Sequence, residues 1–145
     1  MEFEFRIDGW FMGRRVAQMS TVHHSSGIHL IADLHGIAPG MLTDPAALEH
    51  LLRQSAVAAG ASIIYSHFHT FGTGQGVTGV VLLAESHITI HTWPECGFAA
   101  ADIFMCGAAQ PERALEVIVS ALCPASSGIR TIERGDAGKD TRFVA

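Results

Sequence analysis

The sequence has few basic residues, and they form no cluster. Nine Lys and Arg stand against fourteen Asp and Glu, which gives a formal net charge of −5 at pH 7. The only neighbouring basic pair is Arg14-Arg15. Because the binding of nucleic-acid phosphates needs clustered Lys and Arg, the composition argues against a nucleic-acid partner.

Long apolar runs and paired cysteines are also missing. No stretch reaches the roughly 18 apolar residues that a transmembrane helix needs. The first ten residues, MEFEFRIDGW, lack the basic start and apolar core of a signal peptide. We therefore expect a cytoplasmic protein without a membrane partner. Cys96, Cys106 and Cys123 form no CxxC pair and are expected to be free thiols.

The 145 residues have the length of one domain. Residues 1–27 include the loop-like stretch MSTVHHSSG and are expected to form an N-terminal extension that is partly disordered. A folded domain is expected over residues 28–135. The charged remainder, residues 136–145, is expected to be a flexible tail.

Hydrophobic periodicity predicts eight elements inside the domain. Asp44-Pro45 and Pro111 are typical helix starts. The expected strands cover residues 29–35, 61–71, 77–84, 87–93, 98–106 and 128–135. The resulting order, β-α-β-β-β-β-α-β, predicts an α+β two-layer sandwich: an antiparallel β-sheet with two helices on one face. The nearly continuous apolar character of 77–84 predicts a strand that is buried on both faces.

Residues 84–107 place many polar groups in a segment that otherwise has the pattern of sheet core. Such groups must be hydrogen-bonded or functional. One interpretation is a metal site from His67, His69, His87 and His91, although no carboxylate or cysteine stands at a ligand spacing beside them. Another is a Cys-His hydrolase with Cys106 as nucleophile, although nothing in the sequence marks its activation.

A third interpretation uses the whole segment. AESHITIHTWPE, GFAAADIFMCG and GVTGVV, together with GIHLIADLHG at residues 27–36, resemble the small prokaryotic S-adenosylmethionine decarboxylases. The resemblance extends from Gly27 to Gly135. It implies a proenzyme that cleaves itself between Glu85 and Ser86 and makes its pyruvoyl cofactor from Ser86.

The chemistry that this resemblance implies requires a serine at position 86. Its hydroxyl attacks the carbonyl of Glu85, and β-elimination then leaves a dehydroalanine. This residue tautomerises and loses ammonia, which leaves a pyruvoyl group at the start of the new chain. The resemblance implies that His91 accepts the α-proton during processing, with Thr78 assisting where the family has a serine. The pyruvoyl group then forms a Schiff base with the substrate amine. Cys106 is implied to be the proton donor in catalysis.

The resemblance also implies the substrate, S-adenosylmethionine, and a role in spermidine biosynthesis. Phe71 and His91 match residues that stack on adenine, and Glu95 matches one that binds the ribose. In an extended strand, the five residues from Ser86 to His91 span about 16 Å. The backbone must therefore turn near residues 85–87, or neighbouring strands or protomers must complete the site. The family places its active sites at the interface of a dimer.

Some positions depart from the family pattern, among them Cys96, Phe98 and Met105. These departures leave open a pyruvoyl-dependent decarboxylase of a free amino acid, arginine or ornithine, in which Asp102 would hold the distal cation. A non-catalytic or metal-binding relative is the third possibility. The retained Phe71 and Glu95 favour the nucleoside substrate.

Overall fold

The computed structural model describes residues 26–135. The expected tail, 136–145, and all but the last residues of the expected extension, 1–27, lie outside the described residues. Both therefore stay predictions.

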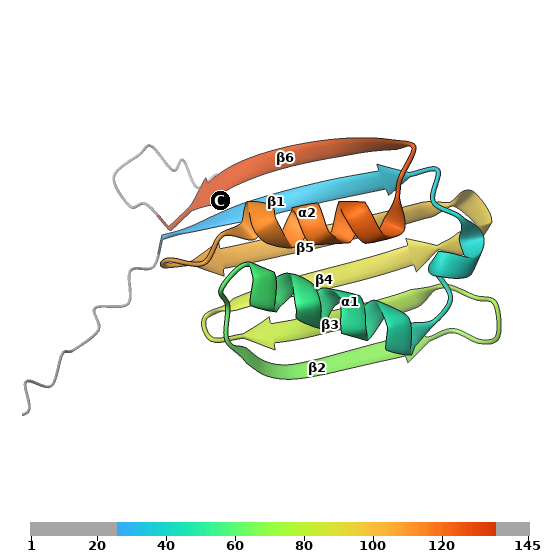
Figure 1. Cartoon of the computed structure of the whole chain (residues 1–145), viewed down its shortest axis with the longest axis horizontal. Helices are drawn as coiled ribbons and strands as arrows, with labels where there is room; N and C mark the ends of the chain where they lie inside the picture. The colour runs from blue at the N-terminus through green and yellow to red at the C-terminus, as the bar shows by residue number, and fades with distance from the viewer. Residues whose placement is uncertain (1–25, 136–145) are drawn as a thin grey trace, which may run out of the picture.

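The described chain contains six strands and two α-helices in the predicted order (Figure 1). Two short 3₁₀ helices, η1 (Pro39–Met41) and η2 (Pro94–Cys96), lie in loops. The main elements are β1 (Gly27–His35), α1 (Pro45–Ala58), β2 (Ile63–Thr70), β3 (Val77–Leu83), β4 (Ser86–Trp93), β5 (Phe98–Cys106), α2 (Pro111–Leu122) and β6 (Ser126–Arg134).

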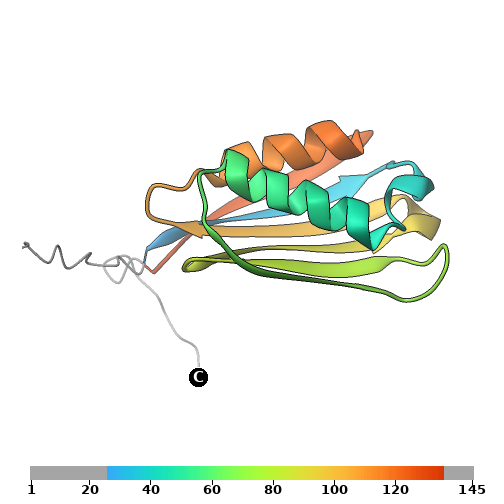
Figure 2. The ribbon, with the colours of Figure 1, turned by 60° about the horizontal axis from the view of Figure 1, so that its bottom comes forward.

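All six strands form one antiparallel sheet in the order β2-β3-β4-β5-β1-β6. β2 to β5 follow one another as neighbours, whereas β1 inserts between β5 and β6. Both helices pack on the same face, and Figure 2 shows the other face bare. The predicted two-layer α+β sandwich is therefore confirmed.

Local sequence signals set the helix starts. The Asp44 carboxylate accepts hydrogen bonds from the backbone N–H groups of Ala46 and Ala47, at 2.9 and 3.2 Å, and Pro45 occupies the first helical position. This arrangement satisfies donors that a helix start otherwise leaves unpaired. Pro111 likewise occupies the first position of α2, where the Gln110 side chain does not cap the helix, and Cys123 ends this helix in a left-handed conformation.

The hydrophobic core lies between the sheet and the helices. Side chains alternate along β4 and β5, so that Ile88, Ile90 and Ile103 are buried against the helices. The prediction that residues 77–84 are buried on both faces is wrong for the single chain. Within residues 26–135, no helix covers the second face, and Leu82 is 42% exposed there.

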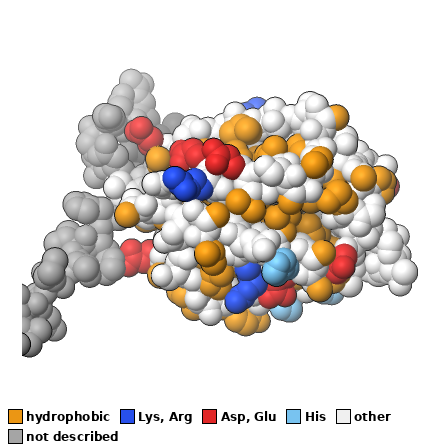
Figure 3. Space-filling model, viewed as in Figure 1, with side chains coloured by type: hydrophobic (Ala, Val, Ile, Leu, Met, Phe, Trp, Pro, Cys, Tyr) orange, Lys and Arg blue, Asp and Glu red, His pale blue; other side chains and the backbone are white. Residues whose placement is uncertain are grey.

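The helix-bearing face carries scattered charges among apolar and neutral side chains, without one large charged patch (Figure 3). Over residues 26–135, neither helix is long and apolar enough to span a bilayer.

Candidate functional site

The turn between β3 and β4 contains the bond at which cleavage is expected. Leu83 and Ser86 pair across the turn, and Ala84 and Glu85 form its tip. Glu85 has φ +64°, in the left-handed region that residues with a Cβ avoid. The residue that supplies the expected scissile carbonyl is therefore held in a strained conformation.

Ser86 and Cys106 lie side by side although twenty residues separate them. The N–H of Cys106 donates to the Ser86 hydroxyl oxygen at 3.1 Å. Cys106 ends β5 opposite Gly27 of β1. A Cβ at position 27 would stand 2.8 Å from the Cys106 sulfur and 2.7 Å from the Phe104 ring. Glycine at this position therefore leaves the space that the thiol uses.

A cavity of about 380 Å³ opens beside this turn. Its lining combines the expected cleavage site with residues of β4, β5 and the end of β6. The lining residues are Glu85, Ser86, His87, Phe104, Arg134 and Gly135.

A second group of expected site residues lies near the other end of β4. His91 pairs with Thr78 across β3 and β4, and the Thr78 hydroxyl lies 3.0 Å from His91 Nδ1. Both line a cavity of about 300 Å³ with Phe71, Trp93 and Glu95. The structure thus brings together the residues that were expected to bind the nucleoside.

The two groups are separate within one chain. The backbone turns at Ala84-Glu85, but β4 is continuous from Ser86 to Trp93, so no bend brings His91 back toward Ser86. Five residues of extended strand place them about 16 Å apart. A proton acceptor must approach to about 3 Å. Within one chain, His91 is therefore too far from Ser86 for direct proton transfer. The two groups of expected site residues are called half-sites below.

The face that the helices leave bare carries six histidines at strand positions: His29, His35, His67, His69, His87 and His91. Within residues 26–135, no three His, Cys, Asp or Glu side chains converge as a metal site would require. The four histidines considered as ligands are thus not assembled into one site by this chain.

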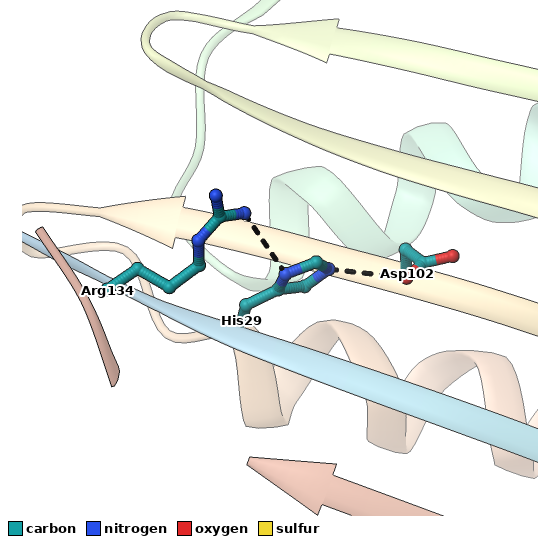
Figure 4. Close-up of polar contacts among 3 residues, drawn as sticks. All are labelled: His29, Asp102 and Arg134. Atoms are coloured by element: carbon teal, nitrogen blue, oxygen red, sulfur yellow. Dashed lines mark hydrogen bonds and ion pairs between the residues drawn. The ribbon is translucent and has the colours of Figure 1, made fainter. Parts of the chain in front are cut away.

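Asp102, which was considered for holding the distal cation of a free amino acid substrate, already lies close to another side chain. Asp102 Oδ1 lies 3.3 Å from His29 Nε2, and His29 Nδ1 lies 3.5 Å from a guanidinium nitrogen of Arg134 (Figure 4). Burial lowers the pKa of neighbouring His87, His29 lowers it further, Asp102 opposes the change, and Arg134 adds a smaller lowering. His87 is therefore neutral at pH 7.

Comparison with known proteins identifies the family. The family described as S-adenosylmethionine decarboxylase matches residues 28–135. The chain belongs to this family.

Individual members of the S-adenosylmethionine decarboxylase family match most of the chain. The S-adenosylmethionine decarboxylase proenzyme of Hydrogenobaculum is 41% identical over 81% of this chain and 91% of its own length. That of Methanococcus aeolicus is 46% identical over 75% and 93%. The crystal structure of the Aquifex aeolicus adenosylmethionine decarboxylase superimposes with a TM-score of 0.73 at 35% identity, covering 82% of this chain and 98% of that one.

Sequence reasoning had not connected Arg134 with the site. Arg134 lies 48 residues beyond Ser86, and only the pairing of β6 with β1 brings it to this end of the sheet. The pairing register of β1 with β5 and β6 is what would have connected Arg134 with the site. Arg134, Gly27 and Cys106 share one cross-strand row, but that row cannot be known before the strand order is known.

Proposed function

We propose that this chain cleaves itself between Glu85 and Ser86, carries a pyruvoyl group at residue 86, and decarboxylates S-adenosylmethionine. The observation that carries this proposal is the contact between Ser86 and Cys106, at a strained turn that borders a cavity. The membership in a family of proenzymes named for this activity supports it.

The surroundings of Ser86 fit a pyruvoyl group made from that residue. The Ser86 hydroxyl lies next to the Glu85 carbonyl in sequence, and the Cys106 amide contacts its oxygen. Attack by this oxygen on the carbonyl carbon converts the peptide bond to an ester. Removal of the Ser86 α-proton then breaks the Cβ–Oγ bond, and its electron pair leaves with Glu85 as a carboxylate. The dehydroalanine that remains at residue 86 tautomerises to an imine, and hydrolysis of the imine by water releases ammonia and leaves the ketone of the pyruvoyl group. The pyruvoyl group supplies an electron-withdrawing carbonyl that condenses with the substrate amine.

We assign the removal of the α-proton to His91. Its contact with the Thr78 hydroxyl supports this role if the ring donates from Nδ1, because Nε2 is then unprotonated and able to accept a proton. Thr78 would thus select the reactive tautomer. Cys106 is assigned to return a proton to the substrate carbon after CO2 has left, since it is the last residue of β5 and its backbone N–H contacts the Ser86 hydroxyl.

The second cavity suits the nucleoside part of the substrate. Phe71 is 66% exposed, and its ring faces solvent at the edge of a cavity that also contains His91. A stacked aromatic pair contributes about 1 kcal/mol beyond the area that it buries. Glu95, in η2, offers a carboxylate that can accept hydrogen bonds from ribose hydroxyls.

A homodimer would join the two half-sites. The bare sheet face exposes large apolar side chains at Tyr65, Leu82, Trp93 and Ile132, each at least 40% accessible. If two copies pack these faces around a two-fold axis, the Ser86 end of one β4 can meet the His91 end of the other, and the reverse contact follows by symmetry. The active unit would then be a dimer of cleaved chains with two shared sites.

Two measurements test this proposal directly. Denaturing mass spectrometry of the purified protein is expected to show residues 1–85 and a pyruvoyl-blocked fragment 86–145, whereas Ser86→Ala remains one chain. The processed protein is then incubated separately with S-adenosylmethionine, arginine and ornithine, followed by cyanoborohydride. Trapping of decarboxylated S-adenosylmethionine on fragment 86–145 is expected. An intact wild-type chain that releases CO2, or trapping of arginine or ornithine alone, would contradict the proposal.

A further inference from the structure

The cavity beside the expected cleavage site contains a fixed cation. Arg134 ends β6 and lines this cavity with Glu85 and Ser86. Its guanidinium carbon lies 5.4 Å from the centre of the Phe104 ring, which also lines the cavity. A guanidinium over an aromatic face is attracted to the ring electrons. Phe104 therefore holds the charge of Arg134 at this end of the sheet.

His29 also contacts this guanidinium. Since arginine only donates hydrogen bonds, the contact of 3.5 Å between its Nη1 and His29 Nδ1 requires Nδ1 to be unprotonated. The ring proton of neutral His29 then resides on Nε2, which lies 3.3 Å from Asp102 without the alignment of a hydrogen bond. His29 thus orients Arg134, and the nearby negative charge of Asp102 favours the proton on Nε2 that leaves Nδ1 free to accept (Figure 4). The contact with His29 occupies one of its five donors.

Arg134 is the one permanent cation among the described residues that line this cavity. His87 also lines it, but burial keeps that ring neutral at pH 7. The only other ionisable group in the lining, Glu85, is acidic. An additional negative charge that forms in this cavity would therefore depend on Arg134.

We infer that Arg134 binds a carboxylate directly beside residue 86. This inference deepens the proposed function and rests on it. The first source of a carboxylate is the chain itself, because cleavage turns the main-chain carbonyl of Glu85 into a terminal carboxylate next to its side-chain carboxylate. The second source is the α-carboxylate of the amino acid substrate. The same guanidinium can meet either group.

The Glu85 terminus is the source that the structure favours. Its carbonyl already belongs to a lining residue, so the charge forms in the cavity without any ligand having to enter. Negative charge develops on the same oxygen when the Ser86 hydroxyl attacks, and again when the carboxylate leaves. Donors that face a developing charge accelerate such steps. Arg134 then acts in self-cleavage, and Asp102 and His29 are positioning residues.

The test compares Arg134→Gln, Arg134→Lys and a matched control, Arg130→Gln, in the full chain. Arg130 lies four residues earlier on the same strand and does not line the cavity. Its replacement by glutamine therefore removes the same charge from the strand but not from the cavity. Cleavage is followed over time by denaturing mass spectrometry. Loss of a hydrogen bond to a charged group predicts cleavage about ten- to a hundred-fold slower in Arg134→Gln. Arg134→Lys, which keeps the charge, is expected to be intermediate, and Arg130→Gln is expected to match the wild type.

A second measurement separates the two sources of carboxylate. On processed protein, KM for S-adenosylmethionine is compared with the inhibition constant of decarboxylated S-adenosylmethionine, which lacks the carboxylate. Arg134→Gln could cleave normally and bind S-adenosylmethionine more weakly while its binding of the decarboxylated compound is unchanged. This result would support the inference with the substrate as the source of the carboxylate. Thermal unfolding of each variant in a Ser86→Ala background shows whether the fold survives. If Arg134→Gln proves unstable, the same measurements are made on Arg134→Lys. They are also made on Arg134→Ala with and without added guanidinium ion, which can take the place of the missing side chain.

The inference is overturned if the folded Arg134 variants match Arg130→Gln in both cleavage and binding. Equal weakening of S-adenosylmethionine and its decarboxylated product, with normal cleavage, also overturns it, because no carboxylate is then recognised. A wild-type chain that does not cleave at all contradicts the proposed function itself, so the two failures are distinguishable.

Discussion

Mixed dimers provide the sharpest test of how the two half-sites are used. In one chain, Ser86 and His91 stand at opposite ends of a continuous strand. Five residues at about 3.2 Å each separate them by about 16 Å, whereas proton transfer needs an approach of about 3 Å. His91 therefore cannot serve the serine of its own chain without unfolding β4. A His91→Ala chain should remain uncleaved alone but be cleaved beside a partner that supplies His91.

The partner in this experiment is a Ser86→Ala chain, which keeps His91 but cannot cleave itself. The two chains are co-expressed with different affinity tags, and the cleaved fraction of each is measured by denaturing mass spectrometry. If equal amounts of the two chains pair at random, about half of the His91→Ala chains have a Ser86→Ala partner. About half of these chains should be cleaved, and none of the Ser86→Ala chains. After purification on both tags, nearly all should be cleaved.

A double variant, Ser86→Ala with His91→Ala, is the matched control partner, since it forms the same dimer without supplying the histidine. Cleavage with this control, or of His91→Ala alone, would show that His91 is not the proton acceptor. Absence of cleavage in doubly purified mixed dimers would refute the shared site.

Three further outcomes follow from the site. Cys106→Ala should still be cleaved but lose about 10²- to 10⁴-fold in kcat for CO2 release, unlike alanine variants of the other two cysteines; an unchanged kcat would require another proton donor. In a Ser86→Ala background, Glu85→Gly should raise the free energy of unfolding by up to about 1 kcal/mol, because glycine adopts φ +64° without strain. The control Ala84→Gly should lower the free energy of unfolding. Below pH 6.5 the unfolded chain binds a proton at His87 that the folded chain resists, so stability falls with acidification until the lowered pKa is passed. Urea unfolding of His87→Gln should show a smaller fall, and an equal fall would refute this linkage.

The sequence by itself determined the elements and the family. Asp44-Pro45 and Pro111 predicted the helix starts, because capping depends on residues within one turn. Because successive side chains of a strand point to opposite faces, the sequence also determined that Ile88 and Ile90 share one face of strand 87–93. The motif around Ser86 identified the family because it is a continuous stretch of residues. Its resemblance also pointed to Cys106, twenty residues away.

Only the tertiary structure decided what these elements bring together. The insertion of β1 between β5 and β6 depends on pairing between distant segments, which no local pattern encodes. That insertion brings Arg134 to the turn at Glu85 and Ser86. The helices cover one face, so the apolar run at 77–84 is buried on one side only. The separation of Ser86 from His91 likewise became definite only with an unbroken β4, because a strand holds residues apart that lie close in sequence.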